Sequence, residues 1–287
     1  MQTHIYRAAE GAVAGKLLLS LASNRDEIRE AQRLRYRVFV EEAGLGARLN
    51  PERLDADDFD PFCDHLIVRE ARTLRVVGTY RLLAPRAARM LGRYYSEGEF
   101  DLARLAHLRD TTVEAGRACI DAHYRGGAVL LLLWSGLADY MRAQQCNYLI
   151  GCASISLSDG GVNAAAIYAG LGADQCAPAE LSVTPRLPIP MRAPAGVKAA
   201  LPPLLRGYLR SGAWVCGEPA WDPQFDCADL FMLLPLARLE GRYSRRYVKD
   251  AASQATPAAS VALSHGAAGK PDPQSAWNPP AAGLPRP

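Results

Sequence analysis

A carboxylate and a guanidinium group lie three residues apart in the strand expected to open residues 111–134: Glu114 and Arg117. A carboxylate such as Glu114 can act as a general base, because an amine attacks only after it has lost its proton. The alternative is a structural ion pair between Glu114 and Arg117. Residues three apart on a regular strand point to opposite faces, so a direct pair would require a bulge between them.

The same stretch continues into a turn with two glycines and then an apolar helix that begins at Ala128. The first four amides of a helix lack internal partners, and a helix N-terminus therefore favours an anion such as a phosphate. Glycine pairs also serve ordinary turns, so an unoccupied turn remains the alternative. The residues that would form the anion site are Arg125, Gly126, Gly127, Ala128 and Val129.

Residues 49–64 form an acidic loop that contains Asp57, Asp60 and Asp64. Carboxylates attract a cationic ligand by Coulomb forces, although salt screens this attraction at an exposed site. One interpretation is a mobile flap that holds an ammonium group. The other is a solvated surface loop without a ligand.

A helix expected to begin at Pro235 has an apolar side and a basic side at helical spacing. A basic face suits an acidic partner protein or an anionic membrane surface. An ordinary solvated helix is the alternative. The apolar side contains Leu236, Leu239, Tyr243 and Tyr247, and the basic side contains Arg238, Arg242, Arg245, Arg246 and Lys249.

Composition excludes several classes of function. The net charge is only +3, which argues against a nucleic-acid partner. The seven cysteines form no CxxC pair and the histidines form no HExxH, so we expect reduced thiols, a cytoplasmic location and no metal site. The longest apolar run, residues 128–134, is far shorter than the ~20 residues that span a bilayer.

Hydrophobic patterning predicts a mixed α/β (α+β) domain over residues 16–250. Residues 1–15 are expected to be a flexible leader, and the Ala/Pro/Gly-rich residues 251–287 a disordered tail. Asn24 is the expected cap of a helix that ends near residue 42. Besides the strand that carries Glu114, strands are expected at residues 16–22, 65–69, 76–82, 148–153, 213–217 and 228–234, and further helices at residues 127–143, 163–171 and 204–210.

The strand, turn and helix at residues 111–134 resemble the acyl-donor site of the GNAT acyltransferase superfamily. Arg125 matches the first position of that family's loop motif, Ala128 takes a glycine position and Leu130 replaces the second small residue. The resemblance implies a mixed, centrally splayed sheet flanked by helices, with a loop that cradles the diphosphate of coenzyme A. It also implies that Tyr168 protonates the leaving thiolate; core packing is the alternative for Tyr168.

A second resemblance covers most of residues 30–250. The segments LRYRVFVEE, VVGTYRLL, YLIGCASI and EPAWDPQFDCADLFMLLPL are similar to those of bacterial L-ornithine Nα-acyltransferases of ornithine-lipid synthesis, whose relatives are sometimes labelled "hemolysin". Residues 37–39, Arg81, Glu114 and Arg117 also resemble acyl-homoserine-lactone synthases.

This resemblance implies transfer of a (3-hydroxy)fatty acyl chain from acyl carrier protein to the α-amine of L-ornithine, which gives lyso-ornithine lipid. The acyl carrier protein thioester is then a co-substrate, and no bound cofactor is expected. A carrier-bound pantetheine has one phosphodiester, which suits the altered loop. Glu114 and Tyr168 are the expected catalytic residues. Arg117 and residues 125–129 would bind the donor, and the acceptor would be bound by Arg81, Asp57, Asp60 and Asp64. The carrier protein or the inner membrane surface would be contacted by Arg238, Arg242, Arg245 and Arg246.

Three alternatives remain open. The first is a coenzyme A-dependent N-acetyltransferase of a small amine, and the second is an enzyme like the acyl-homoserine-lactone synthases. The third is a membrane-active protein, as the label "hemolysin" suggests. The absence of a spanning segment and of a secretion signal argues against the third.

Overall fold

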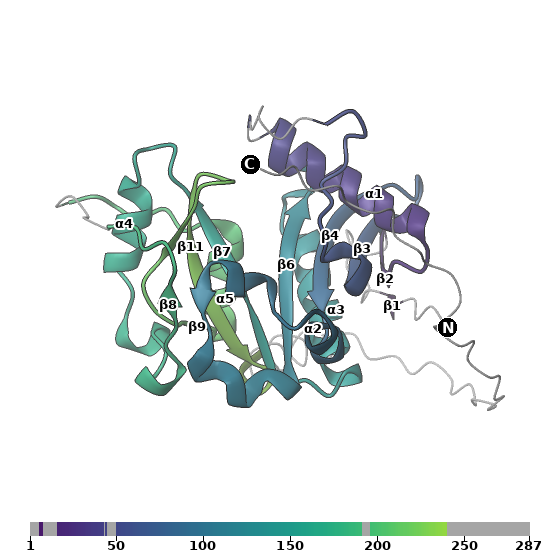
Figure 1. The fold of residues 1–287 in the computed structure, drawn as a ribbon. Coiled ribbons are helices and arrows are strands. Elements are labelled where there is room, and N and C mark those ends of the chain that lie inside the picture. Colours follow the sequence, from purple (N-terminus) through teal and green to yellow (C-terminus); the bar gives the residue numbers. More distant parts are fainter. Residues whose placement is uncertain (1–5, 8–15, 43, 45–49, 191–195, 240–287) are drawn as a thin grey trace, which may run out of the picture. The chain divides into compact units, whose positions relative to one another are not determined.

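The computed structural model describes residues 6–7, 16–42, 44, 50–190 and 196–239 (Figure 1). Among them, nine strands form one sheet in the order β1-β2-β3-β4-β6-β7-β11-β10, with β9 also paired to β11. β6 and β7 run parallel, and the other neighbours in this sheet are antiparallel. The strands are β1 (Tyr6–Arg7), β2 (Leu17–Leu21), β3 (Asp64–Glu70), β4 (Val76–Leu83), β6 (Thr112–Ile120), β7 (Tyr148–Ser156), β9 (Trp214–Val215), β10 (Ala220–Asp222) and β11 (Cys227–Pro235).

A smaller sheet pairs β5 (Phe100–Asp101) with β8 (Thr184–Pro185). The α-helices are α1 (Arg25–Tyr36), α2 (Pro85–Leu91), α3 (Ala128–Ala143), α4 (Val162–Ala169) and α5 (Pro203–Ser211). A π-helical turn, η2 (Arg37–Glu41), continues α1. Short 3-10 segments are η4 (Asp60–Phe62), η5 (Tyr95–Gly98), η6 (Ala103–Thr111), η7 (Ala122–Tyr124), η8 (Ala173–Gln175) and η9 (Ala179–Leu181).

The predicted start of α1 is confirmed. The Asn24 side chain accepts a hydrogen bond from the Glu27 amide at 3.0 Å, and the Glu27 carboxylate accepts one from the Ser23 amide at 2.7 Å. These two bonds satisfy amides that lack helical partners, and the carboxylates of the first turn favour the positive end of the helix dipole.

α1 and α3 cover opposite faces of the β2–β4 part of the sheet. Ala31 and Leu34 of α1 pack against Ile67, whereas Leu133 and Leu137 of α3 belong to the main core on the other face. Two glycines allow α3 to approach closely. A Cβ at Gly78 of β4 would lie 2.3 Å from Val129, and one at Gly136 of α3 would lie 2.8 Å from Leu19.

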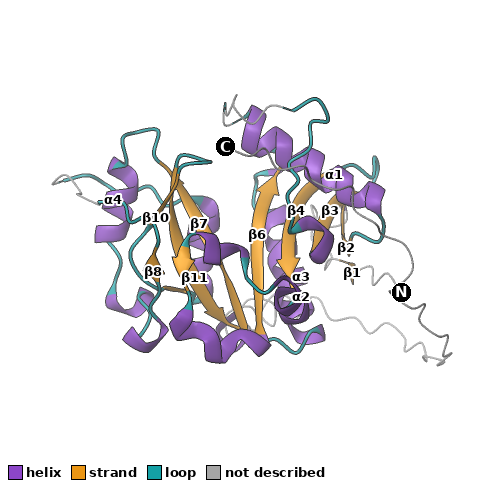
Figure 2. Cartoon of the chain, in the orientation of Figure 1, coloured by secondary structure: helices purple, strands orange, loops and turns teal. Residues whose placement is uncertain are grey.

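The sheet separates at its centre, between β6 and β7. These strands pair only over residues 112–114 and 148–150, and beyond that point they diverge (Figure 2). Gly151 lies where they separate, and a Cβ there would lie 2.2 Å from the Ala115 carbonyl oxygen. On its other edge, β6 contains a bulge opposite Thr79 and Arg81, and Arg117 within the bulge has a left-handed φ of 52°. The predicted mixed, centrally splayed sheet flanked by helices is therefore confirmed.

Several sequence expectations concern residues outside those described. Within the predicted leader, Tyr6–Arg7 forms β1, and the remaining residues up to 15 are not described. The predicted tail, residues 251–287, also lies outside. Helix begins after β11 at residues 236–239, and the rest of the predicted basic helix is not described. Among the described residues, no helix is both long and apolar enough to cross a membrane.

Candidate active site

A cavity of about 630 Å³ opens where β6 and β7 separate. Its walls come from β6, β7, the β10–β11 hairpin and the aromatic side chains of Phe39, Phe59 and Tyr95. Among the described residues, no strand pairs with the backbone of β6 beyond Glu114 on the cavity side. An extended ligand arm could therefore hydrogen-bond to β6 in the manner of an added strand.

Glu114 is buried at the paired end of this cavity, with 4 % of its surface exposed. Its carboxylate accepts hydrogen bonds from the amides of Tyr95 (2.6 Å) and Ser96 (2.8 Å) and from the Ser96 hydroxyl. Burial raises the pKa of Glu114, although these hydrogen bonds oppose the shift. The structure records no ion pair between Glu114 and Arg117 among the described residues, and Arg117 pairs with Asp55 and Asp57 instead.

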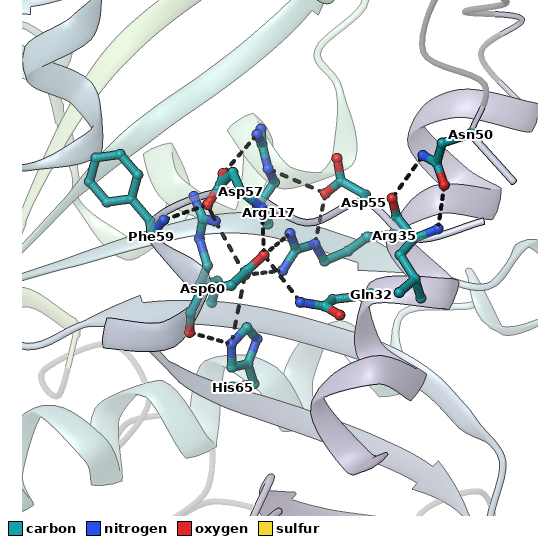
Figure 3. A network of polar contacts seen from close by, with 11 residues as sticks. Gln32, Arg35, Asn50, Asp55, Asp57, Phe59, Asp60, His65 and Arg117 are labelled. Carbon is teal, nitrogen blue, oxygen red and sulfur yellow. Dashed lines mark hydrogen bonds and ion pairs between the residues drawn. The ribbon is translucent and has the colours of Figure 1, made fainter. Parts of the chain in front are cut away.

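Three arginines and three aspartates form a network beside the cavity (Figure 3). Arg35 from α1 bonds to Asp55 at 2.8 Å and to Asp60 at 2.7 Å. Arg81 from β4 bonds to Asp57 at 2.5 Å, and Arg117 from β6 lies 3.3 Å from Asp57 and 3.4 Å from Asp55. The guanidinium groups, which come from three separate elements, thus neutralise the carboxylates of one loop.

The ionisation of these aspartates is favoured by their partners. Burial alone would raise the pKa of Asp60, but the hydrogen bonds and charge of Arg35, together with the charge of Arg81, hold it well below its usual range. Burial likewise opposes ionisation of Asp57, and Arg81 outweighs it, so the pKa of Asp57 is lowered. Both aspartates are therefore charged at neutral pH.

This network differs from the flap of free carboxylates that the acidic loop suggested. Asp57 and Asp60 are ion-paired to Arg81, so their charge is not available to a cationic ligand. Asp64 lies apart and accepts a hydrogen bond from the Tyr140 hydroxyl at 2.7 Å. The arginines that pair with the loop are 20 to 60 residues away in sequence, so no local pattern revealed them.

A second group of acids in the cavity was missed by the sequence analysis: Glu99, Asp222 and Asp229. Two cysteines, Cys152 and Cys227, lie among them. Burial and the neighbouring Asp229 raise the pKa of Glu99 well above its usual value, and burial also raises the pKa of Asp229. The available signal was an aspartate inside the otherwise apolar strand CADLFMLLP, since such a position is rarely charged without a purpose.

The residues of the predicted anion loop form the turn that leads into α3. Gly127 caps α3 with a φ of 98°, and no hydrogen bond is recorded for the amides of residues 126–129 within the described part of the chain. The Arg125 side chain donates to the Ile120 carbonyl at 3.1 Å and pairs with Glu42. The loop lies beyond the far end of β6 and does not line the cavity itself.

Three comparisons with known proteins bear on this geometry. Residues 34–135 match the acetyltransferase (GNAT) domain family. A protein of Rhodobacter capsulatus named L-ornithine N(alpha)-acyltransferase is 36% identical over 249 residues, which cover 80% of this chain and 94% of the relative. A protein of Brucella abortus with the same name is 35% identical and covers 83% of this chain and 90% of the relative.

The chain belongs to the L-ornithine N(alpha)-acyltransferase family. It is therefore an acyltransferase, and its GNAT domain contains η2, β4, β6 and the start of α3. Among solved structures, a coenzyme A-dependent acyl-homoserine lactone synthase aligns at a TM-score of 0.48 and 16% identity over 78% of this chain and 87% of that chain.

Within this acyltransferase fold, Tyr168 does not reach the cavity lining. It lies half-buried on α4, packed against the main core. Tyr80 and Tyr95 line the cavity instead, and the Tyr80 and Tyr208 hydroxyl groups are 2.7 Å apart. Of the predicted basic residues, Arg238 is exposed and lies 3.7 Å over the Trp214 ring, whereas Arg242, Arg245 and Arg246 are outside the described residues.

Proposed function

We propose that the protein transfers a (3-hydroxy)fatty acyl chain from acyl carrier protein to the α-amine of L-ornithine, which yields lyso-ornithine lipid. The observation that carries the proposal is identity of about 35% across four fifths of the chain to relatives named for this acceptor. The splayed cavity with a buried carboxylate supports it, because the reaction needs both a place for the thioester arm and a proton acceptor.

The donor arm fits between the separated strands. Free backbone groups of β6 would pair with the amides of the pantetheine arm, and the unpartnered amides at the start of α3 would bind its phosphate. A carrier-bound pantetheine has a single phosphodiester, so it needs fewer hydrogen-bond donors from this loop than the diphosphate of coenzyme A does. The altered loop motif therefore favours the carrier protein as donor.

Acyl transfer then proceeds by direct attack. Glu114, directly or through a water molecule, takes the proton of the amine, and the amine nitrogen attacks the thioester carbon. A backbone amide of β6 would stabilise the oxyanion. As the tetrahedral intermediate collapses, the C–S bond breaks and the thiolate takes up the proton that the attacking nitrogen loses as it becomes an amide. The α-amine is the easier nucleophile to form, because α-amino groups titrate near ~8 and alkyl amines near ~10.

The cysteines of the cavity do not offer a covalent route. Burial raises the pKa of Cys63 to about 12, and burial also raises the pKa values of Cys152 and Cys227. A protonated thiol is a poor nucleophile, so an acyl-cysteine intermediate is disfavoured. This supports direct attack by the amine.

Purified protein should acylate L-ornithine at its α-nitrogen with a 3-hydroxyacyl carrier protein thioester, as mass spectrometry of the product would show. Glu114→Gln should lower kcat by about 100-fold or more, since general bases typically contribute that much. Glu180→Gln, an exposed site on η9, is the matched control and should retain full activity.

Circular dichroism would verify that Glu114→Gln is folded. Near-normal turnover by this variant would assign the base elsewhere. Turnover of acetyl-coenzyme A, without turnover of any carrier-protein thioester, would instead favour a coenzyme A-dependent N-acetyltransferase.

A further inference from the structure

The acids Glu99, Asp222 and Asp229 are brought together by three elements on one wall of the cavity. Asp229 of β11 lies opposite Ser154 of β7, and Asp222 ends β10 next to it. The ligand-capable atoms of Glu99, Cys152 and Asp229 lie within 4.8 Å of one another. Asp229 is buried, with 3 % of its surface exposed, and Glu99 is half-buried at the cavity wall.

One atom of this cluster is able to accept a further hydrogen bond. Glu99 Oε2 is shielded from solvent and has no hydrogen-bond partner among the described residues. A buried carboxylate oxygen without a donor is costly, and native proteins usually supply a partner. In a cavity that must admit an amine, a ligand N–H group can supply it.

The cluster also lacks a cationic partner from the protein. Arg81 and Arg117 are the arginines that line the cavity, and both are ion-paired to the Asp55–Asp60 network. Among the described residues, no ion pair reaches Glu99, Asp222 or Asp229. The cavity therefore has one wall where negative charge is balanced and another where it is not.

We propose that Glu99 and Asp229, with Asp222 beside them, bind the side-chain ammonium group of the acceptor amino acid. The inference rests on the proposed function, which supplies an acceptor with two amines. This proposal places the ammonium site at these acids and not at the acidic loop, because arginines already neutralise Asp57 and Asp60. An ammonium has three N–H donors, which suits carboxylates that converge from two sides.

Protonation links the cluster to its ligand. The titratable groups that face Glu99 are Asp229 and Cys227 of β11, Asp222 of β10, Cys152 of β7 and Tyr95 of η5. Burial and these acids raise the pKa values of Glu99 and Asp229, so the pair holds a proton more tightly than exposed carboxyl groups do. An ammonium group between them favours the ionised form. Ornithine binding should therefore release a proton.

The test compares L-ornithine with L-norvaline, which has the same carbon chain without the side-chain amine. Wild-type enzyme should prefer ornithine strongly. Glu99→Gln and Asp229→Asn should each raise the KM for ornithine by about 10- to 100-fold, the usual worth of a hydrogen bond to a charged group, and leave kcat/KM for norvaline within about 2-fold. Glu180→Gln should change neither value.

A second measurement uses the unaltered protein. Calorimetric titration with ornithine at pH 7.5, in two buffers of different ionisation enthalpy, should show proton release, and titration with norvaline should show none. A wild-type enzyme that acylates ornithine but does not discriminate against norvaline would overturn the inference and leave the proposed function intact. Failure to acylate ornithine at all would overturn the proposed function.

Other outcomes assign the cluster differently. Equal loss of kcat with both acceptors would make Glu99 and Asp229 a general base or a structural pair, and would overturn the ammonium site. Stoichiometric divalent metal in the purified enzyme, lost in Asp229→Asn, would show that Glu99, Cys152 and Asp229 hold a metal ion instead.

Discussion

At the scale of single residues, the two groups of carboxylates in and beside the cavity are tuned in opposite directions. Asp57 and Asp60 face guanidinium groups, so their pKa values are lowered. Glu99 and Asp229 are shielded from solvent and lie next to each other, so their pKa values are raised. The same residue types are thus ion-paired on one wall and, among the described residues, lack an arginine partner on the other.

The lowered pKa values of Asp57 and Asp60 determine how the free energy of unfolding should depend on pH. A carboxylate with a depressed folded-state pKa contributes stability that is present above its unfolded pKa and lost as pH falls through the folded value. The free energy of unfolding should therefore decrease as pH falls below about 4, the ordinary pKa of aspartate. Asp60→Asn should be less stable than wild type at pH 7 and lose less stability on acidification.

Urea unfolding between pH 7 and pH 3 would measure both slopes. Asp110→Asn is the control, because Asp110 is exposed and pairs only with Arg89 in the described structure. A wild-type slope equal to that of Asp60→Asn would contradict the role assigned to the arginine network.

At the scale of elements, the separation of β6 from β7 depends on Gly151. A Cβ at this position would lie 2.2 Å from the Ala115 carbonyl oxygen, closer than real Cβ atoms come. The residue therefore sets the point, near the buried Glu114, where the strands part. The Arg117 bulge acts on the other edge of β6 and turns this guanidinium toward Asp55 and Asp57.

Gly151→Ala should lower the free energy of unfolding by about 1–3 kcal/mol, because the added methyl group forces the two strands apart. Gly116→Ala on β6 is the matched control, since a Cβ there meets no atom within 4 Å and its stability should change little. Urea unfolding measures both. Equal stability of the two variants would show that β7 shifts freely to accept the methyl group.

At the scale of the whole molecule, an exposed basic surface lies on α5 and after β11. Arg206 and Arg210 of α5 and Arg238 line the same surface hollow. Arg238 donates a hydrogen bond to the Gly212 carbonyl at 3.0 Å and stacks on Trp214, so its charge is held in place. An acidic carrier protein would be attracted to such a surface.

The variant Arg206→Glu/Arg210→Glu/Arg238→Glu should raise the KM for the acyl carrier protein donor by about 10-fold or more, in line with the cost of like charges at an interface. Turnover of a short acyl-pantetheine thioester should be unchanged, because this donor lacks the protein. Arg86→Glu, an exposed site on α2, is the control. Equal KM values for triple variant and wild type would place the carrier elsewhere.

The sequence by itself indicated most of the longer helices and strands, and the family. Local signals such as the Asn24 cap, the apolar periodicity of α3 and the glycine turn before it specify structure through neighbouring residues, so they can be read along the chain. The resemblance at Glu114, Arg117 and the segments around them also predicted the acyltransferase family and the splayed sheet.

Only the tertiary structure decided which charges are free. Arg35, Arg81 and Arg117 come from three elements to neutralise the acidic loop, while Glu99, Asp222 and Asp229 converge without a cationic partner among the described residues. The physical reason is that Coulomb and desolvation energies depend on distance and burial in space, which sequence spacing does not encode across elements. The loop that looked most acidic in sequence is therefore the one whose charge is already balanced.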